Sequence, residues 1–150
     1  MLDSLDRRIV EALVADGRQP FVRIAAELGV SEASVRQRVA RMTADGVMQI
    51  TAVTNPFKLG YEVVCMLGLS VDTASLRAAA EALEALDEVT YLVACTGHHD
   101  FLVEVVCRDR RHLMDFLSTG LGGVPGLRDS ESFSYLSVLK ESYRPFPGEW

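Results

Sequence analysis

The chain has 150 residues and a formal net charge of −6 at pH 7, with 49% apolar and 24% charged residues. This length suits one domain or two small ones, and the apolar fraction is large enough for a packed core. The sequence contains no apolar run of the roughly 18 residues that a membrane-spanning helix needs, and it begins without a secretion signal, so we expect a cytoplasmic protein outside the membrane.

The negative charge is concentrated after the first third of the chain. Residues 1–50 contain seven arginines and seven acidic residues and are neutral, so the remaining 8 basic and 14 acidic residues account for the charge of −6. A neutral first part is compatible with DNA binding, because affinity depends on local phosphate contacts and not on the charge of the whole chain. It also predicts that a single copy binds weakly and that the protein acts as a dimer or larger assembly.

A first helix is predicted over residues 4–14, where apolar side chains recur at helical spacing. Ser4 or Asp3 can cap this helix, and Asp16-Gly17 is expected to end it. It would close a three-helix core against the two helices that follow.

Residues 21–28 predict a second short helix, which Gly29 can end in the left-handed conformation. Ser31 is a suitable N-cap for a third helix over residues 31–44. The small Ala25 permits a close crossing of the two helices. This arrangement is a helix-turn-helix pattern, with the third helix offered to the DNA major groove.

The polar face of this motif predicts contacts with DNA. Arginine and glutamine side chains can bond to phosphates and base edges, and a good bidentate pair contributes about 1–3 kcal/mol of discrimination. The candidate DNA-binding residues are Arg23, Ser34, Arg36, Gln37, Arg38 and Arg41. A plain helical hairpin is the alternative interpretation; the spacing of Gly29 and a face rich in Arg and Gln favour DNA binding.

After Asp45-Gly46, residues 47–54 predict a strand that forms a short wing and leads into a linker ended by Asn55-Pro56. We therefore expect a winged helix-turn-helix domain over residues 1–50 and a linker strand over residues 51–60.

Residues 61–140 predict a ferredoxin-like domain with the order β-α-β-β-α-β. The expected elements are a strand over residues 61–71, a helix over 74–86 capped by Thr73, strands over 88–95 and 101–107, a helix capped by Asp109, and a strand over 127–139. The fold class is therefore α+β, with two helices on one face of an antiparallel sheet. Residues 141–150 form a C-terminal tail.

The strands of this domain are apolar on both faces. One face is expected to pack against the helices and to include Val89, Tyr91 and Val93. The other face is predicted to carry Val64, Met66, Leu92, Ala94, Leu102, Val106, Leu136 and Val138. A sheet with two apolar faces needs a second cover, so we expect the same face of another copy, with the N-terminal domain as the alternative cover.

The loop between the second and third strands is a candidate ligand site. Its residues are Thr96, Gly97, His98, His99 and Asp100. Gly97 frees backbone N–H groups for a carboxylate, and Asp100 offers an anion for an ammonium group, which are the two charge preferences of a free amino acid. An ordinary hairpin loop is the alternative interpretation.

The sequence gives little indication of a metal, catalytic or cofactor site. The three histidines, His98, His99 and His112, lack the spacing of a metal site, and no catalytic constellation or cofactor motif is evident. Cys65, Cys95 and Cys107 fall within apolar runs and are expected to be small buried hydrophobic residues.

Several segments occur in a characteristic order along the chain. They are LDSLDRRI at 2–9, DGR at 16–18, IAAELGVS at 24–31, Arg38 with Arg41, DG at 45–46, NPFKLGY at 55–61, TGHHD at 96–100 and VPG at 124–126. Together they resemble the Lrp/AsnC (leucine-responsive, feast/famine) family of transcriptional regulators.

This resemblance implies a winged-helix DNA-binding domain and an effector domain that dimerises through its sheets. It also implies dimers assembled into tetramers or octamers, with a small effector, usually an amino acid, between dimers. The Gly–x–x–Asp loop of the family corresponds to Gly97 and Asp100. Two features differ from the family pattern: Met48-Gln49-Ile50 follows the DG pair, and two histidines occupy the TGHHD loop. The tail extends beyond the shared pattern, and its aromatic residues could cover a neighbouring subunit.

We therefore expect a regulator that binds double-stranded DNA as a homo-oligomer and is tuned by a small effector. Two other classes remain: a metabolite-sensing module that acts through protein partners, and a small ferredoxin-like enzyme. Binding to a protein partner without binding to DNA would identify the first, and turnover lost on Asp100→Asn would identify the second.

Overall fold

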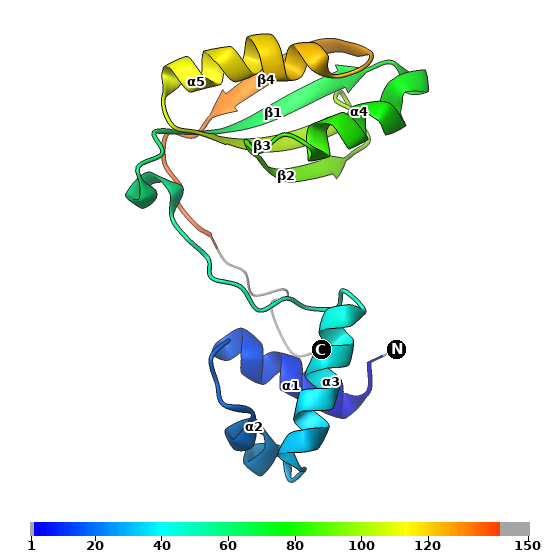
Figure 1. The fold of residues 1–150 in the computed structure, drawn as a ribbon, viewed down its shortest axis with the longest axis vertical. Helices are drawn as coiled ribbons and strands as arrows, with labels where there is room; N and C mark the ends of the chain where they lie inside the picture. The colour runs from blue at the N-terminus through cyan, green and yellow to red at the C-terminus, as the bar shows by residue number, and fades with distance from the viewer. Residues whose placement is uncertain (1, 142–150) are drawn as a thin grey trace. The chain divides into compact units, whose positions relative to one another are not determined.

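The computed structural model describes residues 2–141, which fall into two compact units divided between Val53 and Thr54 (Figure 1). Within residues 2–141, no helix is both long and apolar enough to cross a membrane.

The first unit contains three helices, α1 (Ser4–Ala15), α2 (Phe21–Leu28) and α3 (Glu32–Ala44). Their apolar faces meet in a core that includes Ile9, Ile24, Val35 and Met42, all with 0% exposure. Because such residues recur every three or four positions, each helix has one face to bury and the three close on one another. The predicted helix-turn-helix is confirmed.

The ends of these helices follow local capping chemistry. Asp3 is the N-cap of α1 and forms a reciprocal capping box with Asp6: each backbone N–H donates to the other carboxylate, at 2.8 and 3.1 Å. Gly29, with φ of 69°, ends α2 in the left-handed region. The Ser31 hydroxyl accepts from the Ser34 N–H and caps α3.

The prediction of a strand over residues 47–54 is wrong. Residues 48–55 have no regular secondary structure, and a short 3-10 helix, Pro56–Leu59, follows them. An extended segment is stabilised by pairing with another strand, and the described part of the first unit contains no other strand. Ile50 and Val53 are instead more than half exposed.

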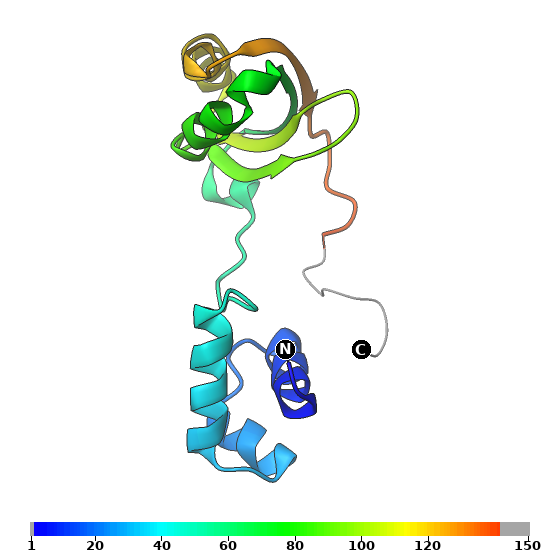
Figure 2. The same cartoon turned by 90° about the vertical axis from the view of Figure 1, so that its right-hand side faces the viewer.

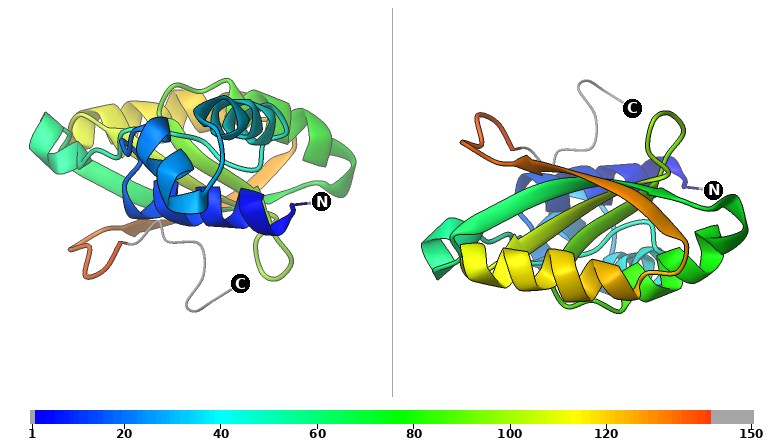
Figure 3. Two further views of the ribbon diagram at one scale, coloured as in Figure 1. Left: turned by 90° about the horizontal axis from the view of Figure 1, so that it is seen from below. Right: turned by 90° about the horizontal axis from the view of Figure 1, so that it is seen from above.

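The second unit is a four-stranded antiparallel sheet with the spatial order β2-β3-β1-β4. The strands are β1 (Val63–Val71), β2 (Val89–Ala94), β3 (Phe101–Cys107) and β4 (Leu127–Ser134). Both helices, α4 (Leu76–Glu84) and α5 (Arg110–Asp115), cover one face of the sheet (Figures 2 and 3). A π-helical turn, Phe116–Gly120, and a 3-10 turn, Leu121–Gly123, extend α5 toward β4. The predicted order of strands and helices is confirmed.

The core of this unit lies between the sheet and its helices. It includes Leu67 and Leu69 of β1, Val103 and Val105 of β3, and Leu83 of α4, all with 0% exposure. Cys65 and Cys107 also lie in this core, as predicted, whereas Cys95 is only half-buried.

Two element boundaries differ from the predictions. A 3-10 turn, Thr73–Ser75, precedes α4, so Thr73 is not the N-cap of that helix. The last strand ends at Ser134 and not at residue 139, because Tyr135 makes the last bond to β1, at Val64, and β1 begins at Val63. Leu136 and Val138, predicted on the sheet, therefore lie beyond it and are 99% and 52% exposed.

A bulge in β2 reverses the predicted facing of its side chains. Val89 lies opposite Val105, but Tyr91 lies opposite Glu104, so β2 has one extra residue at this point. As a consequence Leu92 packs into the helix-side core, while Tyr91 is 55% exposed. The assignment of Tyr91 and Val93 to the helix side, and of Leu92 and Ala94 to the other side, is therefore wrong, because a one-residue shift moves each side chain to the opposite face.

The face of the sheet opposite the helices remains largely apolar. Its members, identified from the strand register, are Val64, Met66, Val93, Leu102, Val106 and Phe133. Glu104 lies among them, and its carboxylate accepts hydrogen bonds from Tyr135 Oη at 2.7 Å and Thr90 Oγ1 at 3.0 Å. We call this surface the open sheet face.

Candidate DNA interface and ligand loop

The outward side of α3 carries two of the predicted DNA-binding residues. Arg36 and Gln37 are both exposed. Arg36 forms an ion pair with Glu32 one turn earlier, and its guanidinium lies 5.5 Å from the centre of the Phe21 ring on α2. Two other predicted residues lie beside them: Arg23 on α2 is exposed and pairs with Glu27 at 3.8 Å, and Ser34 is half-buried near the start of α3.

The other two arginines of α3 face α1. Arg38 Nη1 donates to Asp3 Oδ2 at 2.6 Å and to Asp6 Oδ1 at 2.8 Å. Arg41 Nη2 donates to the second oxygen of Asp6, also at 2.6 Å. The Asp6 side chain is only 1% exposed, compared with 26% for Arg38 and 51% for Arg41. We call these four residues the Asp6 cluster.

The electrostatics of the Asp6 cluster favour its charged form. Burial acts to raise the pKa of Asp6, but the hydrogen bonds from Arg38 and the Asp3 amide, with the charge of Arg41, outweigh burial and lower that pKa below its ordinary value. The hydrogen bond from Arg38 likewise lowers the pKa of Asp3, and both carboxylates raise the pKa of Arg38. Both carboxylates therefore stay ionised at neutral pH and hold Arg38 between them.

The position of Asp6 in the sequence of α1 is itself a signal for this cluster. Asp6 occupies the apolar stripe of α1, three, four and seven residues before Ile9, Val10 and Leu13. A carboxylate on the buried face of a helix needs a cationic partner, because an unpaired buried charge is costly. The only basic residues on α3 are Arg36, Arg38 and Arg41.

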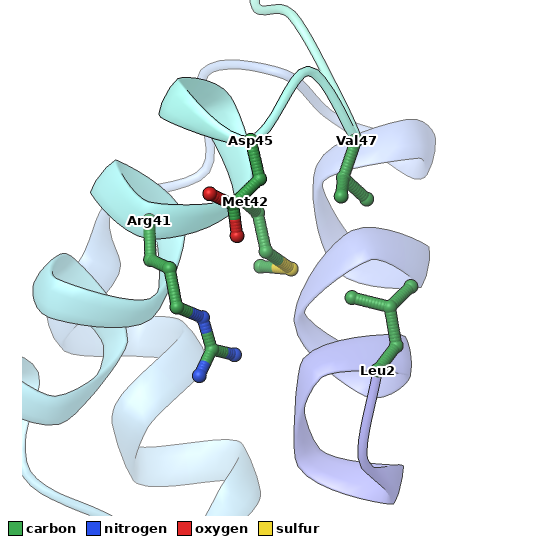
Figure 4. A pocket seen from close by; sticks show the side chains of 5 residues that line it. All are labelled: Leu2, Arg41, Met42, Asp45 and Val47. Atoms are coloured by element: carbon green, nitrogen blue, oxygen red, sulfur yellow. The ribbon is translucent and has the colours of Figure 1, made fainter.

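A shallow pocket of about 260 Å³ lies between the start of α1 and the end of α3 (Figure 4). Leu2, Met42 and Val47 supply its apolar lining, and Arg41 and Asp45 add one charge of each sign. This pocket leaves one side of the Arg41 guanidinium open to solvent, although its other side is bound to Asp6.

The ligand loop, residues 96–100, connects β2 to β3. Thr96, Gly97 and His98 are exposed, and Gly97 adopts a φ of 137°, a conformation that favours glycine. The Asp100 carboxylate accepts the Val71 N–H at 2.9 Å and lies 3.8 Å from the Arg128 guanidinium of β4. Asp100 is 37% exposed, so it can still reach a ligand while β1 fixes its orientation.

The side chain of His99 points away from the rest of the loop and lies over β1 on the open sheet face. Its imidazole occupies the space where a side chain at Gly68 would begin, and its Nε2 lies 3.1 Å from the carboxylate of Glu131 on β4. Its Nδ1 is buried without a hydrogen-bond partner among the described residues. His112 is bound elsewhere, with Nε2 2.9 Å from Glu88, and no three metal-ligating side chains gather within residues 2–141.

Comparison with known proteins relates both units to one family. Residues 2–43 match the family model of the AsnC-type helix-turn-helix domain, and residues 62–145 match that of the Lrp/AsnC ligand binding domain. An HTH-type transcriptional regulator of Pyrococcus furiosus is 40% identical over 144 residues, which cover 95% of this chain and 97% of that protein. The regulatory protein AsnC of Escherichia coli is 32% identical over 138 residues, 91% of each chain.

Solved structures agree with these relatives. The structure of E. coli AsnC superposes with a TM-score of 0.80 at 30% identity, covering 94% of this chain and 96% of AsnC. The leucine response regulatory protein LrpA of Mycobacterium tuberculosis gives a TM-score of 0.88 at 27% identity, covering 97% and 100%. The chain belongs to the Lrp/AsnC family of helix-turn-helix transcriptional regulators.

Proposed function

We propose that this regulator binds specific double-stranded DNA sites through α3 as a homodimer or a larger assembly, and that an amino acid or similar metabolite bound at residues 96–100 modulates the binding. The observation that carries the proposal is the exposed Arg36 and Gln37 on a helix presented by a complete helix-turn-helix. Two such helices in a two-fold dimer would read half-sites about one helical turn, or a multiple of it, apart. Binding to the chromosome would place the protein in the cytoplasm.

The DNA half of the proposal has a matched pair of variants. Arg36 on α3 and Arg77 on α4 are both exposed. Arg36 pairs with a glutamate four residues earlier, and Arg77 pairs with one four residues later. If α3 contacts phosphates, Arg36→Ala should weaken duplex binding. It should also make the slope of log affinity against log salt concentration shallower by about one unit. Arg77→Ala should change neither quantity. Fluorescence anisotropy of a labelled duplex measures both quantities. Equal behaviour of the two variants would contradict the assignment.

The effector half rests on Gly97 and Asp100. A thermal-shift screen across the amino acids should find a ligand that raises Tm by mass action. Asp100→Asn retains an oxygen for the Val71 N–H but removes the negative charge, so it should abolish the Tm rise without lowering the Tm of the free protein by much. Asp129→Asn, which removes an exposed charge from β4, is the control and should leave the rise intact. A rise that persists in Asp100→Asn would place the ligand elsewhere.

The assembly rests on the open sheet face, which we propose is covered by the same face of a second copy. Met66 lies in the middle of this face, opposite Glu104 and Phe133. Met66→Asp would add two negative charges to each two-fold interface, one from each copy, beside the Glu104 and Glu131 carboxylates already on this face, and should dissociate the assembly in sedimentation experiments. Met114→Asp, at an exposed methionine of α5, should not. Unchanged sedimentation of Met66→Asp would exclude this interface.

A further inference from the structure

Neighbouring positions 37 and 38 of α3 point in different directions. Arg38 is turned toward α1, where two carboxylates hold its guanidinium at 2.6 and 2.8 Å. Gln37, about 100° further round the helix, is exposed, and its side chain makes no hydrogen bond to any residue among those described.

Arg38 cannot leave its partners without disturbing the buried carboxylate of Asp6. Asp6 is 1% exposed, so its charge must be matched by arginines and not by water. If Arg38 moved to a base, Asp6 would keep the Asp3 N–H and only one arginine, Arg41, which contacts it through a single nitrogen. The arrangement therefore fixes Arg38 within the protein and uses it to hold α3 against the start of α1.

Gln37 is the longest free side chain on the outward strip of α3. On the same strip, Ala33 lies one turn before it and Ala40 one turn after it, and both are exposed. Such small neighbours let the helix approach base edges closely. The side-chain amide of glutamine combines a donor and an acceptor, which match the N7 and N6 of adenine in the major groove. Arg36, the adjacent alternative, pairs with Glu32 and lies over the Phe21 ring of α2, so we assign it to a phosphate, as above, and not to a base.

We infer that Gln37 determines base preference, by reading adenine, and that Arg38 is a positioning residue held by Asp3 and Asp6. This division of roles rests on the proposed DNA binding. It assigns sequence discrimination to an uncharged residue and leaves the arginine beside it to orient the helix.

The test is selection of duplexes from a library with a randomised centre, using the full-length protein. Gln37→Ala should still bind DNA and should fold normally, because alanine favours helix and the site is exposed. The motif that it enriches should lose one adenine preference in each half-site, by about fivefold to a hundredfold in relative affinity. Arg38→Lys and Asp6→Asn should enrich the wild-type motif unchanged, with affinity lowered by the same factor on matched and mismatched duplexes.

The outcomes distinguish failure of the assigned residue roles from failure of DNA binding itself. A changed motif with Arg38→Lys together with an unchanged motif with Gln37→Ala would overturn the inference, as would loss of a preference for a base other than adenine. Circular dichroism of each variant distinguishes loss of the helical unit from loss of contacts. If the wild-type protein itself enriches no motif, the proposed function fails before the inference is reached.

Discussion

Replacing Asp6 by asparagine is the most direct test of the packing of α1 against α3. The substitution keeps the size of the side chain and an oxygen for the capping box but removes the charge that Arg38 and Arg41 share. Breaking a fully buried ion pair costs about 3–5 kcal/mol. Arg41 is half exposed and the stranded arginines would regain some water, so we expect the first unit to lose about 2–3 kcal/mol of its free energy of unfolding.

Hydrogen exchange read by mass spectrometry can assign that loss to one unit. Amides of α1 and α3 should exchange about 30- to 150-fold faster in Asp6→Asn, while those of β1 and β3 in the other unit should not change. Glu11→Gln is the control, because Glu11 is an exposed carboxylate on the same helix. If both variants exchange alike, the Asp6 cluster contributes nothing measurable and the reasoning from burial is refuted.

The same cluster predicts a direction of pH dependence. The pKa of Asp6 in the folded protein is lowered, so its contribution is fully present above the ordinary value of about 3.9 and is lost as the pH falls through the lowered value. Acidification below about pH 4 should therefore accelerate exchange of α1 and α3 more in the wild-type protein than in Asp6→Asn. Asp3, whose pKa is lowered in the same direction, contributes with the same sign.

Three further predictions concern single positions. Gly68→Ala would place a methyl group where the His99 imidazole lies, so the ring should leave the sheet and its NMR signals should shift, whereas Gly122→Ala, in open space, should leave them in place. Unmoved ring signals would contradict the packing. Burial raises the pKa of Cys107 to about 11, so at pH 8 the thiol stays protonated and iodoacetamide should not label it until the protein unfolds; labelling of native protein would show that the site opens. Gly29→Ala forces a side chain into the left-handed region and should cost about 1 kcal/mol in chemical denaturation, and an unchanged midpoint would mean that the turn relaxes.

Local patterns were sufficient to predict most of the fold. Gly29 and Ser31 mark a helix end and a helix start through their own backbone and hydroxyl chemistry, which depends on few distant contacts. The alternation of apolar residues in β3 predicted its bounds. This strand lies between β2 and β1, and its side chains alternate between the two faces of the sheet along its whole length.

The errors occur where the structure depends on a partner that local patterns do not contain. Val47, Ile50 and Val53 have the composition of a strand, yet the described first unit offers no second strand for pairing. In β2 an extra residue before Tyr91 places the following side chains on the opposite face of the sheet from the one predicted. The sequence could not show this, because a bulge without glycine has no fixed sequence signature.

The candidate site shows the same limit. The sequence identified which side chains of α3 could bond to DNA, but it could not show that Arg38 and Arg41 are occupied within the protein. Their partner Asp6 is 32 residues away from Arg38 along the chain, and the pairing arises only when α1 packs against α3. The outward placement of Gln37 follows from the helical repeat alone and needed no distant contact.

The ligand loop is fastened to the sheet at several points. The Asp100 N–H donates to Leu69 at 2.8 Å, the Asp100 carbonyl accepts from Cys95 at 3.0 Å, and its carboxylate accepts from Val71. Ser70 adds a hydroxyl bond to the carbonyl of His98 at 3.3 Å. These bonds hold residues 98–100 against β1, so this part of the loop is preformed. A metabolite bound at this loop, as proposed, would therefore meet a preformed surface and lose little affinity to ordering it, and selectivity would depend on the shape of the metabolite more than on any closing motion.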